Sequence, residues 1–251
     1  MNATLITLIA FASIFGAALL AMRLRAALPD HQLSADTKDS VRVGMGLVAT
    51  MTALLLGLLI ASAKGSYDIQ RTEVIQIAAN VGFLDRVLSV YGPETAQARD
   101  LLRGEVESVI PRLWPEKGSQ STPTNQTAAQ AQAMYDSLQK LEPQNEAQRS
   151  LKTQALATTI DLSKTLWLLT AQREPSIVTP LLIAVVLWLA AIFLSFGLFA
   201  PPNKTVIATM LIVALSVSSA LFLMLELDRP FDGVIQISNA PMRNVLSQLG
   251  H

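Results

Sequence analysis

The sequence contains no cysteine and only two histidines, His31 and His251, in 251 residues. The absence of thiols excludes disulfide bonds, thiol nucleophiles and thiolate metal ligands, and two histidines cannot build a multi-histidine metal site within one chain. Glycine-rich phosphate loops, nucleophile elbows, zinc motifs and dense acidic calcium loops are also missing. The sequence therefore gives no support to an enzyme, and we expect no cofactor and no bound metal.

Charge is scarce as well. Charged residues make up 15% of the chain, and 19 basic residues balance 19 acidic ones, so the net charge gives no reason to expect nucleic acid as a partner. Hydrophobic residues make up 51%. That content is too high for an ordinary soluble domain and indicates a membrane protein, whose first partner is the lipid bilayer.

Four apolar runs contain no Lys, Arg, Asp or Glu, and each is long enough for a helix to cross about 30 Å of hydrocarbon. We predict transmembrane helices at about Ala3–Met22, Val43–Ala63, Ile177–Ala200 and Val206–Leu225. No basic residue precedes the first run, which predicts an anchor rather than a cleavable signal peptide. The first two runs are joined by the polar segment Arg23 to Arg42, and the last two by the tight hairpin "APPNK".

The segment between the second and third runs has a helical pattern and no strand pattern. Its apolar residues recur at alternating spacings of three and four, at Val74, Ile77, Val81, Leu84 and Leu88. This spacing predicts a helix that continues the second run without a break and ends at "YGPET", where Gly92 closes it and Pro93 opens the next helix. Further helices are predicted to about Ile110, and over about Ala128–Leu141 and Asn145–Gln172, with a flexible loop at Leu113–Thr127.

The predicted fold is therefore an all-α membrane protein with four transmembrane helices and a helical extramembrane domain between the second and third. The expected parts are residues 1–63, 64–176, 177–226 and a C-terminal tail, 227–251. In the tail, "VIQIS" suggests a short extended piece and "APMRNVLSQL" a short amphipathic helix.

One side of the second run carries a stripe of small residues that ends on a lysine. The stripe consists of Gly46, Thr50, Ala53, Gly57, Ile60 and Lys64. Small residues let membrane helices approach closely, so helix packing explains the stripe. A pore wall explains it too, because small and hydroxyl side chains leave room for water. The fourth run has a similar stripe, formed by Thr209, Ile212, Ser216, Ser219, Leu223 and Glu226.

Charged residues gather where the second and fourth runs end, on one side of the membrane. They are Lys64, Glu226, Asp228 and Arg229, with Arg173 and Glu174 before the third run. Three interpretations stay open: interfacial anchors, mutual pairing that fixes the tail, or a charged ring at a pore mouth of a symmetric oligomer. The short connections between spans are rich in basic residues, which places the helical domain outside the cytoplasm by the positive-inside rule.

The stretch "GLVATMTALLLGLLIASAKGSYDIQ" together with "ELDRPFDGVIQIS" resembles the bestrophin-like family of four-span bacterial membrane proteins, over nearly the whole chain. The name implies a distant relation to bestrophins, which are pentameric anion channels with a cytoplasmic helical region, an orientation opposite to the one that charge favours. Leu54 to Ile60, "LLLGLLI", is loosely similar to the apolar neck of a bestrophin second span. The aromatic residues of the bestrophin neck are missing from this stretch, and the acidic calcium clasp of animal bestrophins has no counterpart in this sequence.

The main functional hypothesis is an oligomeric ion channel of the bacterial inner membrane, with the second transmembrane helix lining the pore. Leu54, Leu58 or Ile60 would gate it by dewetting, and Lys64 would favour anions such as chloride. The first alternative is a membrane scaffold or sensor whose helical domain binds a partner or ligand. The second is a proton channel of the stator type, which the absence of an acidic residue within any span core disfavours.

Overall fold

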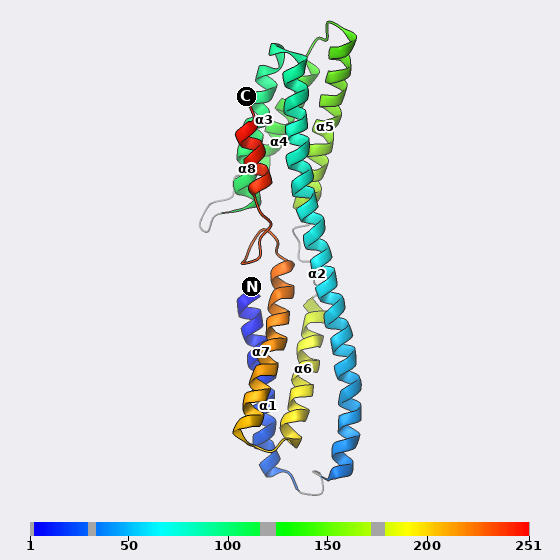
Figure 1. The fold of residues 1–251 in the computed structure, drawn as a ribbon, viewed down its shortest axis with the longest axis vertical. Coiled ribbons are helices and arrows are strands. Elements are labelled where there is room, and N and C mark those ends of the chain that lie inside the picture. Colours follow the sequence, from blue (N-terminus) through cyan, green and yellow to red (C-terminus); the bar gives the residue numbers. More distant parts are fainter. Residues whose placement is uncertain (1–2, 30–33, 116–123, 172–178, 251) are drawn as a thin grey trace. The chain divides into compact units, whose positions relative to one another are not determined.

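The computed structural model describes residues 3–29, 34–115, 124–171 and 179–250, with the side chains of residues 26 and 124–131 left out. Within these ranges the chain forms helices and no strand, which confirms the predicted all-α class (Figure 1). The helices are α1 (Ala3–Leu24), α2 (Ala35–Tyr91), α3 (Ala96–Leu113), α4 (Thr124–Gln139), α5 (Glu146–Ala171), α6 (Thr179–Phe199), α7 (Lys204–Leu227) and α8 (Ala240–Gln248), with short 3₁₀ turns at Arg25–Ala27 and Pro93–Thr95.

All four predicted membrane spans fall on helices that are long and apolar enough to cross a bilayer, namely α1, α2, α6 and α7. Two local predictions need correction. The first connector is shorter than expected because α2 begins at Ala35, and α4 begins at Thr124, inside the predicted loop, whose residues 116–123 lie outside the described part. The stretch "VIQIS" forms bends and irregular chain.

Helix α2 is a single helix of 57 residues. It contains no proline, which would remove a backbone hydrogen bond, so nothing interrupts it between the apolar span and the polar segment. It stops at Gly92, whose φ of 139° is a conformation that favours glycine. The hydroxyl of Thr95 donates to the carbonyl oxygens of Leu88 (2.6 Å) and Gly92 (2.7 Å), which also accept the backbone N–H groups of Gly92 and Thr95, so the helix end is held by side chain and backbone together.

The chain divides into two compact units. The membrane unit comprises residues 1–66 and 175–229, and the helical unit comprises residues 67–174 and 230–251. This division places most of the C-terminal tail with the helical unit, and α2 contributes to both.

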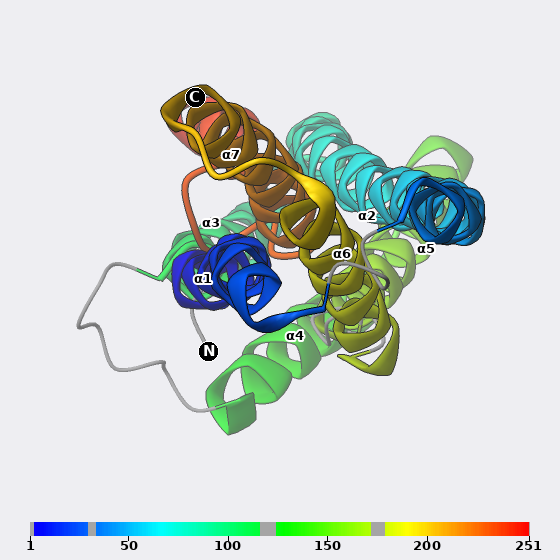
Figure 2. The same ribbon diagram turned by 90° about the horizontal axis from the view of Figure 1, so that it is seen from below.

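Helix α1 packs against α6 and α7, and α6 lies between α1 and α2 (Figures 1 and 2). Gly197 of α6 allows the closest approach. A Cβ atom at this position would overlap the carbonyl oxygen of Ala18 and lie 3.0 Å from the Cβ atom of Ala21. Small residues therefore set the α1–α6 distance, as is usual where helices associate in lipid.

The core of the helical unit forms around the face of α2 that the spacing predicted, since all five of its apolar residues from Val74 to Leu88 are buried. The guanidinium of Arg99 binds the carboxylate of Asp85 with two hydrogen bonds, of 2.7 and 3.1 Å. The tail packs onto this unit through Phe231, Ile237 and Met242. The indole nitrogen of Trp114 donates to the carbonyl oxygen of Ile237 at 2.7 Å, which fixes the tail to the end of α3.

Replacing Gly197 with alanine should destabilise the protein, because the new methyl group must push α1 away from α6. Overpacking of this kind costs about 1–3 kcal/mol. The matched control is Gly57→Ala, since a Cβ atom at Gly57 meets no atom within 4 Å. Thermal unfolding of both variants in detergent tests the contact, and equal unfolding temperatures for the two would contradict it.

Candidate functional site

Helix α2 is the least covered helix of the membrane unit. Only 11% of its most apolar window is buried, against 28% in both α1 and α6. The covered edge consists of Thr52, Leu59 and Ala63, of which the last two join the buried cluster that α1, α6 and α7 form. Most of the circumference of this span is therefore left to lipid, water or another protein chain.

The predicted stripe of small residues lies on the uncovered side of α2. Gly46, Thr50, Ala53, Gly57 and Lys64 are all exposed, and Ile60 is half-buried. Because successive residues turn by about 100°, the stripe is centred roughly 120° around the helix from the covered edge. The structure thus keeps the six residues together along one side of the helix.

The glycines of this stripe do not serve packing within the chain. A Cβ atom at Gly46 or Gly57 would meet no atom within 4 Å, in contrast to Gly197. The hydroxyl of Thr50 donates to the carbonyl oxygen of Gly46 at 3.0 Å, so its hydrogen is already engaged while its lone pairs stay open. Close packing therefore remains an explanation of this stripe only if the neighbouring helix belongs to another chain.

The gate candidates do not share one face. Leu54 and Leu58 have exposed fractions of 71% and 66%, and they lie about 90° around the helix from the centre of the stripe. Ile60 lies at the edge of the stripe itself. If the stripe faces a pore axis, Ile60 is the bulkiest apolar side chain in its row, and the two leucines flank that row.

The polar stripe of α7 is also exposed, except at its end. Thr209, Ser216 and Ser219 are exposed, and each hydroxyl donates to the carbonyl oxygen four residues earlier, at 2.8–3.0 Å. Glu226, the last residue of this stripe, is buried, with only 4% of its surface exposed. This residue is therefore covered by its neighbours, unlike the hydroxyl residues of the same stripe.

The charged residues at this end of the membrane unit differ in exposure. Helices α2 and α7 run in the same direction, so Lys64 and Glu226 occupy the same end of the unit (Figure 1). Lys64 is exposed, Asp228 and Arg229 are half-buried, and Glu226 is buried. Arg173 and Glu174 lie outside the described residues. The most accessible charge at the end of the α2 stripe is therefore positive.

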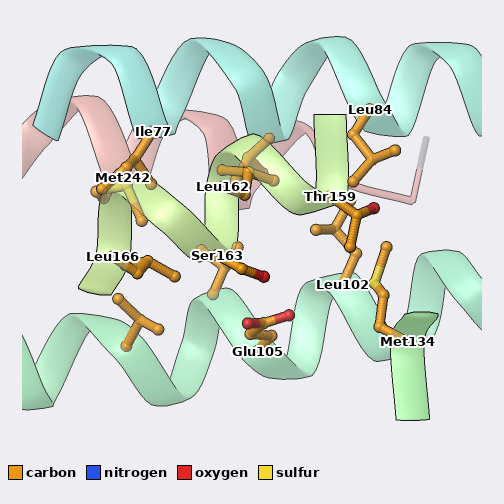
Figure 3. Close-up of a pocket in the computed structure, with 13 residues that line it drawn as sticks. Ile77, Leu84, Leu102, Glu105, Met134, Thr159, Leu162, Ser163, Leu166 and Met242 are labelled. Atoms are coloured by element: carbon orange, nitrogen blue, oxygen red, sulfur yellow. The ribbon is translucent and has the colours of Figure 1, made fainter. Parts of the chain in front are cut away.

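One polar residue that the sequence analysis passed over is Glu105 of α3. It lines a pocket in the helical unit (Figure 3). The sequence did contain a signal for this residue. Glu105 lies between Leu101 and Leu102 on one side and Val106 and Val109 on the other, which places its carboxyl group at the margin of an apolar helix face. No cluster of three or more Asp, Glu or His side chains suited to a metal occurs among the described residues.

A family model, Bestrophin-like domain, matches residues 12–242. The chain belongs to the bestrophin-like family. The crystal structure of a bacterial bestrophin homologue from Klebsiella pneumoniae, determined with one mutation, has a similar fold, with a TM-score of 0.71 at 12% sequence identity. The similarity covers 97% of this chain and 98% of the other. No curated protein matches the sequence.

Family membership and fold agree with the four apolar helices, and together they identify a membrane protein of bestrophin-like architecture. The match spans both units, so the helical unit is part of the family's fold and not an unrelated insertion. At 12% identity the structural similarity concerns the fold, and the roles of individual side chains have to be argued from this chain alone.

Proposed function

We propose that the protein is an oligomeric ion channel whose pore is lined by α2. The observation that carries the proposal is the stripe of Gly46, Thr50, Ala53 and Gly57, which is left uncovered by α1, α6 and α7 and leads to Lys64. A lipid-facing surface has no need for a row of small side chains, whereas a water path needs the space that they leave.

Assembly is a requirement of this function. Helix α1 packs directly against α6 and α7, and the α2 stripe lies on the outside of a single chain. A ring of identical chains brings such outer stripes together around one axis. The resemblance to bestrophins favours five copies. The bilayer is the bacterial inner membrane, and the basic connectors favour an extracytoplasmic helical domain.

We infer a preference for anions, chloride first. Lys64 is exposed at the end of the stripe, while Glu226 at the same end is buried. An anion at the pore mouth would therefore be attracted by Lys64 more strongly than a cation would be attracted by Glu226. A ring of lysine side chains at a pore mouth attracts anions. Ile60 is the best-placed apolar constriction in the row, and Leu54 and Leu58 would close the pore only after a rotation of α2.

The alternative is a non-conducting scaffold or sensor. It is favoured by the pocket in the helical unit and by the unbroken course of α2, which joins the pocket wall to the membrane span in one helix. In that case the stripe of α2 is a packing surface between chains, and a bulkier residue at Gly57 weakens assembly without affecting any ion flux.

Proteoliposomes that hold the purified protein should release chloride faster than potassium when each gradient is tested separately. Lys64→Glu should reverse or reduce the chloride preference by roughly an order of magnitude, because about 1.4 kcal/mol of changed electrostatic energy is tenfold in selectivity. Lys204→Glu, at the start of α7, is the control and should leave the preference unchanged. Absence of flux from protein that still assembles would reject the channel and favour the scaffold.

The water path itself can be mapped with single cysteines, since the chain has none of its own. In assembled protein, cysteines at Thr50 and Gly57 should react with a charged, membrane-impermeant thiol reagent and reduce the flux. The control is Leu187→Cys on α6, which is 62% exposed in the single chain but is expected to face lipid, where the reagent does not reach. Reaction at position 187 and none at positions 50 and 57 would place the pore elsewhere.

A further inference from the structure

The helical unit carries large apolar side chains that its own core does not cover. Among the described residues of this unit, most of them belong to two helices: Ile69, Ile75, Phe83 and Val90 on α2, and Ile160, Trp167 and Leu168 on α5. Phe83 is 51% exposed and Trp167 is 73% exposed. Exposed aromatic side chains among aliphatic neighbours are typical of surfaces that bind another protein or a membrane.

Phe83 and Val90 define one outward face of α2. They are exposed and stand seven residues apart, which puts them on the same side of a helix. This α2 face is turned by about 140° from the centre of the buried line that runs from Ile77 to Leu88. It is also turned by about 90° from the stripe of small residues. The α2 face is therefore neither part of the core nor part of the stripe that is proposed to line the pore.

Lipid can cover only one end of the row to which this face belongs. Leu54 and Leu58 are exposed on the same side of α2 within the membrane span, so the row begins there. Phe83 stands nineteen residues after Lys64, which is about 28 Å further along the helix axis and beyond the headgroups of a bilayer. A partner that covers the whole row has to extend from the membrane into water, and a second copy of this chain has that form.

The second outward face lies on α5. Ile160 and Trp167 are also seven residues apart, and they lie roughly opposite the buried residues Leu162 and Leu169. This α5 face is at the same level along the unit as Phe83. The neighbour of Phe83, Leu84, and the neighbour of Ile160, Thr159, line the same pocket (Figure 3). One helical unit thus presents two different apolar faces at one level.

We propose that the α2 face of one copy packs against the α5 face of the next copy, so that the helical units form a closed ring of their own. A ring of identical chains needs a contact in which each copy contributes two different faces. Rotation about an axis normal to the membrane keeps every residue at its level, so faces at one level can meet. This contact rests on the assembly that the proposed channel requires, and it lies apart from the pore.

Cysteine pairs in the full-length protein test the contact, since the chain has no cysteine of its own. Phe83→Cys is combined in turn with Ile160→Cys and with Trp167→Cys, and the protein is oxidised mildly in detergent. At least one pair should give a disulfide-linked ladder of chains, because a disulfide forms where Cα atoms come within about 4.4–6.8 Å. The single variants should stay unlinked, because two different faces meet. Ser89→Cys, exposed on another side of α2, replaces Phe83→Cys in the matched control and should give no ladder.

The outcome separates this contact from the channel when chloride flux is measured on the same preparations. Assembled, conducting protein in which neither pair is linked would overturn the contact and leave the channel standing. A ladder without any flux would retain the contact and reject the channel. Linkage of Phe83→Cys to itself would replace the ring contact with a two-fold one, and protein that stays monomeric would reject both proposals.

Phe83→Asp should weaken the assembly, because the contact would bury a carboxylate among apolar side chains. The dissociation constant of the copies should rise by about tenfold or more, as for other aromatic residues at the centre of an interface. Ser89→Asp is the control and should leave it unchanged. Analytical ultracentrifugation in detergent measures the assembly, and thermal unfolding shows that the single chain stays folded, since Phe83 is half exposed in it. Unchanged assembly of folded Phe83→Asp protein would refute the contact.

Discussion

The structure depends on one edge of α2 that stays buried from Thr52 in the membrane span to Leu88 near the end of the helix. Thr52, Leu59 and Ala63 in the membrane unit and Gln70, Val74, Ile77, Val81, Leu84 and Leu88 in the helical unit are buried. They follow one another at spacings of three, four or seven residues, which keeps them on a single line along a helix. The same line serves lipid-embedded and water-exposed packing, so the helix needs no kink between them. Everything proposed for α2 concerns the side that this edge leaves free.

The sequence was sufficient to predict this helix and the general fold, because both follow from local physics. Long uncharged runs locate the spans, the absence of proline lets α2 continue, and Gly92 followed by Pro93 ends it. The prediction that the loop extends to Thr127 was wrong, because the polar composition of its last residues is equally compatible with the start of α4 at Thr124. The tail was harder to predict: its attachment depends on the indole of Trp114 and on Ile237, which are far apart in the sequence.

The sequence indicated which residues of α2 share one side of the helix, but not whether that side is exposed or covered by another helix. Gly57 and Gly197 are both glycines in apolar helices, yet a methyl group has free space at the first and overlaps a backbone oxygen at the second. Nothing in the local sequence separates these two cases, because the difference lies in which helix comes close. The same applies to Glu226 and Lys64: burial of the acid and exposure of the lysine depend on packing around the end of α7.

Stability alone explains neither the stripe of α2 nor the carboxyl group of Glu105. A span that only faced lipid would gain from large apolar side chains at Gly46 and Gly57, and glycine within a helix costs about 1 kcal/mol relative to alanine. A pocket that only filled a core would gain from an apolar residue in place of Glu105, whose charge burial disfavours. Residues that lower the stability of their own chain are expected at functional sites, where the protein binds a ligand, an ion or another chain. For the stripe of α2 we propose that this is another copy of the chain and the ions between the copies.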